Sequence, residues 1–170
     1  MIDKRITVLL IPLAIILIQS CLSVARLSDF PKTARGYDFN NIVAAKNVST
    51  DKGWNKKTGL EYYIKTNVTV DSLIIRAITG AIESGGFTIE FLDKNTYAII
   101  GKRGLRANEW KSVIGVYYKI NNDVCEMYVK CKITQDFTGG WRTDRAKKVG
   151  EIICRLPKSC DQSYTVDPSL

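Results

Sequence analysis

The fold is decided by residues 71–91, which read Asp71-Ser-Leu-Ile-Ile-Arg-Ala-Ile-Thr-Gly-Ala-Ile-Glu-Ser-Gly-Gly-Phe-Thr-Ile-Glu-Phe91. Apolar residues recur at steps of three and four over residues 73–82, and Asp71 stands in the first turn, so this part is a predicted amphipathic helix. Gly85-Gly86 marks its C-terminal end. Residues 87–91 then alternate apolar with polar, which is typical of a strand with one buried face.

Further elements of both kinds flank this unit. Alternation with a period of two predicts strands at residues 60–68, 97–102, 114–120 and 124–134, and a closing helix is expected over 146–156, where Pro157 stops it. The order is β-α-β-β-β-β-α. Because each strand has one apolar face and each helix one apolar stripe, we expect a two-layer α+β domain, an antiparallel sheet of about five strands with both helices on one face.

At this coarse level, residues 60–156 resemble the helix-grip domains of lipoprotein subunits of the outer-membrane β-barrel assembly machinery. The motif that carries the resemblance is Ile82-Glu-Ser-Gly-Gly-Phe87-Thr-Ile89. The resemblance supports the fold and implies no activity, since one fold hosts many functions.

The N-terminus has the order of a secretory signal: the basic pair Lys4-Arg5, an apolar run over residues 6–18, and then Gln19-Ser20-Cys21. As a helix the apolar run would be about 20 Å long, short of the roughly 30 Å of a hydrocarbon core. The segment resembles a bacterial lipoprotein signal. The resemblance implies cleavage before Cys21 and fatty acyl chains such as palmitate on that residue, and Leu22 in place of aspartate favours the outer membrane. An uncleaved signal anchor and an ordinary signal peptide are the alternatives.

These features give a plan of the chain. Residues 1–20 are expected to be a removed signal peptide, 21–58 the acylated cysteine with a tether and an irregular lead-in, 59–160 one domain, and 161–170 a tail. Residues 22–36 are expected to be flexible because they mix small, charged and proline residues without periodicity.

Four cysteines remain in the mature chain, namely Cys125, Cys131, Cys154 and Cys160. An even number in an exported chain predicts two disulfides. Cys125 and Cys131 would lie about 20 Å apart on one strand, beyond the ~7 Å reach of a disulfide. We expect the nested pairs Cys131–Cys154 and Cys125–Cys160, with crossed pairing as the alternative. A four-thiolate zinc site fits poorly, because the chain has neither a CxxC motif nor a histidine.

The composition disfavours an enzyme. With no histidine in the chain, the commonest general base is missing. A carboxylate pair from Glu61, Glu90 and Glu126 would suit glycoside hydrolysis, but each falls on the polar side of a strand. Residues 101–104 lack the frame of a P-loop, so no cofactor or metal is expected.

The charge indicates an anionic partner. The net charge is +8, and +7 once residues 1–20 are removed. Lipid headgroups, lipopolysaccharide, glycan polymers and acidic proteins all suit a basic domain, whereas export argues against nucleic acid.

Two segments interleave tryptophan with basic residues and are our candidate binding surface. They contribute Lys102, Arg103, Arg106, Trp110 and Lys111, and Trp141, Arg142, Arg145, Lys147 and Lys148. The alternative is that the tryptophans close the ends of the core and the charges are solvated. We therefore expect a membrane-anchored, non-enzymatic binding or scaffolding module on the periplasmic side of the outer membrane, contacting an envelope protein or an anionic envelope component. A lipid or glycan carrier with a cavity between sheet and helices is the alternative.

Overall fold

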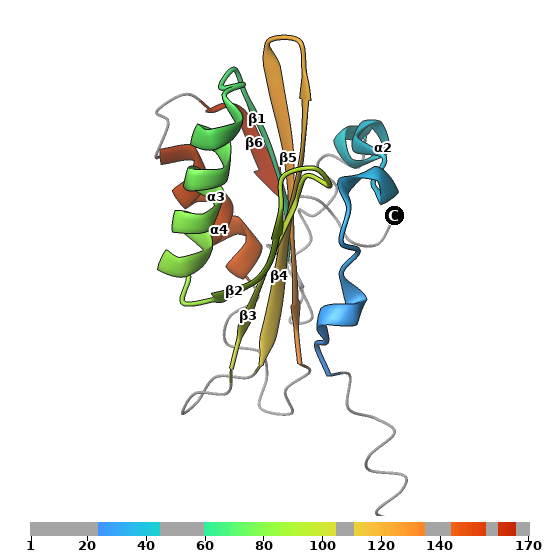
Figure 1. The fold of residues 1–170 in the computed structure, drawn as a ribbon, viewed down its shortest axis with the longest axis vertical. Coiled ribbons are helices and arrows are strands. Elements are labelled where there is room, and N and C mark those ends of the chain that lie inside the picture. Colours follow the sequence, from blue (N-terminus) through green and yellow to red (C-terminus); the bar gives the residue numbers. More distant parts are fainter. Residues whose placement is uncertain (1–23, 45–59, 105–110, 135–143, 156–159, 166–170) are drawn as a thin grey trace, which may run out of the picture.

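The computed structural model describes residues 24–44, 60–104, 111–134, 144–155 and 160–165. Its centre is a six-stranded antiparallel sheet with the strand order β2-β3-β4-β5-β1-β6 (Figure 1). The strands are β1 Glu61–Thr66, β2 Thr88–Asp93, β3 Ala98–Arg103, β4 Ser112–Asn121, β5 Val124–Ile133 and β6 Cys160–Thr165. Two long helices, α3 Asp71–Ser84 and α4 Arg145–Arg155, cover one face of the sheet. The predicted α+β class is confirmed, and no helix among the described residues is long and apolar enough to cross a membrane.

Helix α3 follows the predicted pattern closely. Its buried residues are Ile74, Ala77, Ile78, Ala81 and Ile82, at steps of three and four. The helix ends at the predicted glycines, and Gly86 adopts a φ of +79°, which side chains rarely allow. The layer between sheet and helices is well packed, since its central side chains from both helices and from β1, β4 and β5 have no exposed area.

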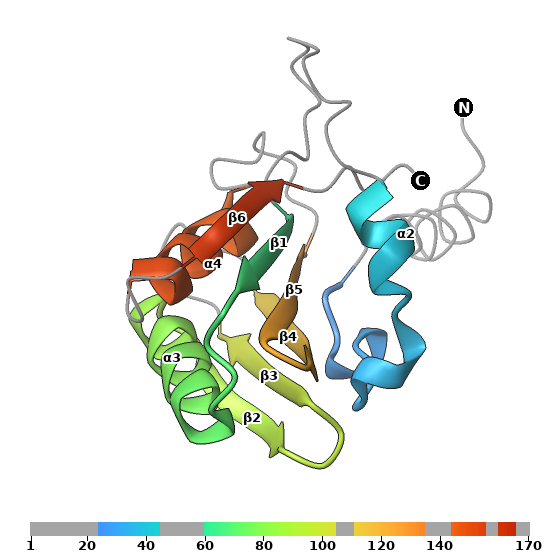
Figure 2. The same ribbon diagram turned by 90° about the horizontal axis from the view of Figure 1, so that it is seen from above.

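The opposite face of the sheet is also covered, by residues 24–44 (Figure 2). This segment contains two short 3₁₀ turns, η1 Leu27–Asp29 and η2 Ala34–Gly36, followed by helix α2 Phe39–Ala44. The apolar residues Ala25, Phe30, Ala34 and Phe39 are buried in a second cluster with Val113 and the tyrosines of the sheet, Tyr63, Tyr117 and Tyr128. The expectation of a flexible tether followed by an irregular lead-in is therefore wrong for the described part of that segment.

Two hydrogen bonds from backbone amides fix residues 24–34 to the sheet. The Ala25 amide donates to Thr134 Oγ1 at 3.2 Å, just beyond the end of β5, and the Ala34 amide donates to the Thr96 carbonyl at 2.8 Å. Thr96 lies in the turn between β2 and β3, at the opposite end of the sheet. Gly115 makes room for the segment, since a Cβ there would meet the Phe30 ring at 2.8 Å. Residues 24–34 consequently run along the sheet from one end to the other.

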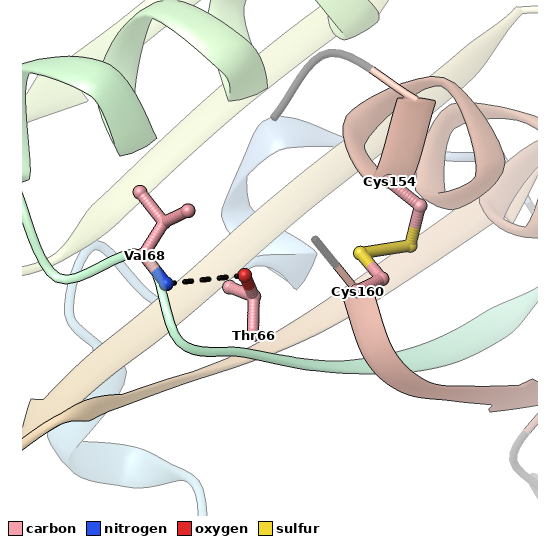
Figure 3. The surroundings of a disulfide bond; sticks show 4 residues. All are labelled: Thr66, Val68, Cys154 and Cys160. Atoms are coloured by element: carbon pink, nitrogen blue, oxygen red, sulfur yellow. Dashed lines mark hydrogen bonds between the residues drawn. A yellow bond between two sulfur atoms is a disulfide. The ribbon is translucent and has the colours of Figure 1, made fainter. Parts of the chain in front are cut away.

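Strand β6 extends the sheet beyond β1, over residues expected to form a tail after Cys160. It is antiparallel to β1, with Thr66 opposite Cys160. β6 follows α4 directly in the chain and is joined to it by the disulfide Cys154–Cys160, whose Cα atoms are 5.2 Å apart (Figure 3).

This disulfide corrects the predicted pairs Cys131–Cys154 and Cys125–Cys160. Thr66 stands opposite Cys125 on one side and Cys160 on the other, so two strand spacings, about 10 Å, separate those two cysteines. The charge of Arg145 acts on the Cys131 thiol, so the first turn of α4 lies near Cys131. Cys154 lies about 14 Å further along the helix, which is too far for a disulfide with Cys131. Cys125 and Cys131 are free and buried, and burial raises the pKa of each to about 12. Both are therefore protonated thiols near neutral pH.

Candidate anion-binding site

Two of the predicted basic residues, Arg103 and Arg145, meet at one cavity of about 330 Å³. Arg103 ends β3 and Arg145 begins α4. The other walls are the last turn and C-terminal glycines of α3 with Phe87, and the first two turns of α4 with Lys148. We call this the basic cavity.

Arg103 is held by the C-terminus of α3. Its Nη1 donates to the Gly85 carbonyl at 3.1 Å, where the last carbonyls of the helix carry negative partial charge. The guanidinium also lies against Gly86, 3.4 Å from where a Cβ would stand. Gly86 thus provides both the helix end and the space that Arg103 occupies.

Arg145 is 7% exposed, and its guanidinium carbon is 6.0 Å from the centroid of the Phe87 ring. A contact of this kind contributes about 0.5–2 kcal/mol. The N-terminus of a helix carries positive partial charge, so a buried guanidinium in the first turn of α4 is electrostatically unfavourable.

Lys148 is the third cation of the cavity. Its exposed ammonium group pairs with Asp144 at 2.9 Å, and Asp144 is the carboxylate among the lining residues. Arg103, Arg145 and Lys148 thus bring three cationic groups to the wall of the cavity. Its chemistry suits a phosphate, sulfate or carboxylate group.

The remaining predicted binding residues divide into two groups. Lys111 is exposed beside the cavity's end of the sheet, and its carbonyl accepts from the Thr134 amide at 2.9 Å, but it does not line the cavity. Arg106, Trp110, Trp141 and Arg142 lie outside the described residues. Sequence reasoning missed the α3 glycines and Phe87 as parts of the site, because they were assigned only to a helix end and the core.

The three candidate catalytic carboxylates are dispersed. Glu61 pairs with Lys130 at 3.3 Å, Glu126 pairs with Lys119 at 3.0 Å, and Glu90 is exposed on the edge strand β2. Glu61 is opposite residue 130 of β5, four residues from Glu126, so their Cα atoms are roughly 13 Å apart.

Glu126 is also in the wrong protonation state for a general acid. Burial raises its pKa, but hydrogen bonds from Tyr63 and Lys119 outweigh that effect and bring the pKa below its ordinary value. A glycosidase pair spans about 5–10 Å and needs one carboxyl that stays protonated; Glu61 and Glu126 are further apart than that, and the lowered pKa of Glu126 does not suit the protonated role.

A second cavity, of about 310 Å³, lies under the N-terminal segment rather than between sheet and helices. Its walls include the rings of Tyr37, Phe39 and Tyr97, together with Arg35 and Lys119. Tyr97 has a φ of +54°, an uncommon conformation for a bulky residue. The basic cavity meets the packed layer under α3 and α4 at Phe87 and Val149, and the second cavity meets it at Tyr118.

The basic cavity has the composition of a binding site. Within the described ranges, no cluster of three or more His, Cys, Asp or Glu side chains could hold a metal ion. Its cations can neutralise and orient an anionic group, and its apolar walls, Phe87, Val149 and Ile152, exclude water around it. Comparison of the chain with protein-family models and with curated proteins finds no match in either.

Proposed function

We propose that this chain is a lipid-anchored, non-enzymatic binding module of the bacterial cell envelope, which captures an anionic group at the basic cavity. The single observation that supports this most is the convergence of Arg103 and Arg145, from sequence segments about 40 residues apart, on one cavity. Charge-assisted hydrogen bonds from arginine are among the stronger polar contacts that proteins make with phosphate and carboxylate.

The proposed location rests on the N-terminal sequence. Acyl chains on Cys21 would hold the protein at the outer membrane, on the periplasmic side, since each buried CH₂ contributes about 0.8 kcal/mol and several chains anchor firmly. Replacing Cys21 by serine should release the protein into the soluble fraction and abolish acyl-chain labelling.

The carrier alternative has weaker support. A lipid or glycan between the sheet and the helices would have to displace side chains such as Ile78, Ile82 and Ile153, which have no exposed area. A carrier role would depend instead on the aromatic cavity beneath residues 34–39.

Anion capture can be tested by nuclear magnetic resonance titration of the mature chain carrying Cys21→Ser, with inorganic phosphate as the probe. We expect the amides of Gly85, Gly86 and Phe87 to shift with a saturable dependence on phosphate. Arg103→Gln should weaken the apparent affinity at least fivefold, because it removes the one cation that ends β3 at the cavity. Lys94→Gln is the matched control, since it removes one exposed charge from the turn at the other end of the sheet.

Shifts that stay linear in phosphate, or that respond equally to both substitutions, would contradict a built anion site. If phosphate binding is saturable, the acylated protein can be used to capture its partner from an envelope extract. The partner should be captured by the Lys94→Gln variant and lost with the Arg103→Gln variant.

A further inference from the structure

We propose that the end of the sheet that carries Arg103 docks against anionic headgroups of the same membrane that holds Cys21. This inference rests on the proposed lipid anchor and names the partner of the basic end as the phosphate-bearing bilayer surface. The acyl chains then supply most of the affinity, and the basic end fixes the orientation of the domain.

The first step is the distance between the anchor and the fold. Ala25 is 6% exposed, and its amide donates to Thr134 Oγ1 beyond the end of β5. Three residues lie between Cys21 and Ala25, which makes four Cα-to-Cα steps, and a fully extended chain covers at most about 3.6 Å per step. The end of the sheet at Thr134 therefore lies within about 14 Å of the proposed acylated residue, too close for the domain to turn freely above the bilayer.

The second step is the charge of that end. Residues 103, 112 and 133 stand side by side across β3, β4 and β5, as do residues 102, 113 and 132, and the Thr134 amide bonds to the Lys111 carbonyl. The described cations at this end of the sheet outnumber the carboxylates around them. The cations are Arg26, Lys102, Arg103, Lys111 and Lys132, and the carboxylates are Asp29, Glu83 and Asp144, with Lys132 and Asp29 2.8 Å apart. Figure 1 shows the start of the N-terminal segment beside the lower ends of β4 and β5 in that view.

The basic cavity belongs to the same end. Helix α3 ends there at Gly85, which accepts from Arg103, and α4 begins there at Arg145, with Lys148 one turn on. Cations of the strand ends and of the basic cavity therefore lie at the same end of the domain as Ala25. A lipid phosphate is the anion that this position brings to the cavity.

The third step is the contrast with the opposite end. There the described charges balance. Five carboxylates stand against five cations, namely Asp38, Asp71, Asp93, Asp123 and Glu126 against Lys32, Arg35, Lys65, Lys94 and Lys119. The described residues thus form a basic end near Ala25 and an electrically balanced end away from it. Lysine and arginine are attracted to an anionic bilayer within a Debye length of its surface, so the membrane field favours the orientation in which the basic end faces the bilayer.

The test uses the mature acylated protein reconstituted into vesicles of phosphatidylcholine alone or with 30 mole per cent phosphatidylglycerol. A water-soluble amine-reactive reagent labels exposed lysines, and mass spectrometry quantifies each site. Lys102 and Lys111 are exposed at the basic end, and Lys94 is exposed at the opposite end, which gives an internal reference. We expect labelling of Lys102 and Lys111, relative to Lys94, to fall at least fivefold on the anionic vesicles and to recover in 1 M salt.

A charge reversal sharpens the test. Lys102→Glu should restore the labelling of Lys111 on anionic vesicles, whereas Lys94→Glu, with the same change of charge at the far end, should leave Lys111 protected. Equal labelling of all three lysines in protein that still floats with the vesicles would overturn the docking and leave the lipid anchor intact. Protection on neutral vesicles that salt does not alter would also overturn it. Protein that fails to float with either vesicle would instead refute the anchor of the proposed function.

Discussion

Replacing Phe30 by alanine tests whether residues 24–44 form a layer of the fold. Phe30 is 3% exposed and packs against the sheet where Gly115 leaves space for its ring. Leu27, three residues earlier, is 36% exposed and provides a control in the same segment. If the segment were a flexible tether, both substitutions would have the same small effect.

The expected magnitude follows from burial. A Phe-to-Ala change in a core costs about 3–5 kcal/mol, which includes the cavity left behind. Here the segment can detach instead of enclosing a cavity, so the loss is limited by the free energy with which it docks. Transfer of the ring alone contributes about 1.5–3 kcal/mol. We therefore expect Phe30→Ala to lower the free energy of unfolding by about 2–3 kcal/mol, and Leu27→Ala by less than about 1 kcal/mol.

The assay is urea unfolding of the mature chain carrying Cys21→Ser, followed by circular dichroism. A lower midpoint with a smaller denaturant slope for Phe30→Ala would indicate that the segment detaches before the sheet unfolds. Equal midpoints for the Phe30 and Leu27 variants would refute the packing of this segment and, with it, the short distance from Ala25 to the anchor.

Three further predictions concern the helix layer, the disulfide and one carboxylate. Gly150→Ala should gain about 1 kcal/mol in helix propensity, yet lower the net stability by about 1–3 kcal/mol, because the new Cβ would overlap the Tyr62 ring. Tyr62→Leu in the same chain should restore most of the loss, and a higher urea midpoint for Gly150→Ala alone would contradict this packing. Cys154→Ser should cost about 2 kcal/mol, the chain entropy of a loop of 6 residues, and a reductant should destabilise the natural chain equally but not this variant. Folding lowers the pKa of Glu126, so the Glu126 carboxylate stabilises the folded state fully above its ordinary pKa of 4.5, and this contribution is lost as pH falls through the folded pKa. Glu126→Gln should therefore reduce the fall in the free energy of unfolding that urea titrations measure between pH 5 and 3.

The helices and central strands could be predicted because their signals are local. The steps of three and four in α3, and the alternation after Gly86, report directly which residues face the core. The inward face of β5 was likewise predicted, since Cys125, Met127 and Cys131 are all buried on the helix side. Local periodicity needs no knowledge of what covers the other face.

The covered second face could not be predicted for that same reason. Tyr63 alternates with Tyr62 and Ile64, and its hydroxyl made it a candidate for the solvent side, yet it is 1% exposed. A tyrosine combines a large apolar ring with one polar atom, so it suits an exposed face and a buried one that offers a hydrogen bond. Here Glu126 accepts that bond. The apolar residues of the N-terminal segment recur with neither a helical nor a strand period, so the sequence pattern does not predict that they pack on the sheet.

The candidate site was predicted in part. Arg103 and Arg145 were chosen for their basic, aromatic surroundings, but the contact that positions Arg103 is with the α3 C-terminus, which depends on how β3 returns past that helix. The predicted disulfide pairing was wrong for a similar reason. Its pairing depends on β6 adding beside β1, a long-range choice that places Thr66 between Cys125 and Cys160.

Coverage of both sheet faces decides which surfaces remain for a partner. Helices α3 and α4 occupy one face and residues 24–44 the other, so the described part of the chain leaves open the ends of the strands and the edge strands β2 and β6. Of the two ends, one carries the cations and the cavity and is also the end to which Ala25 ties the chain. A tether of about 15 flexible residues would have let that end face any direction. Since the segment packs on the sheet instead, the proposed anchor at Cys21 would set the direction of the basic end, and the orientation of the domain would follow from its fold.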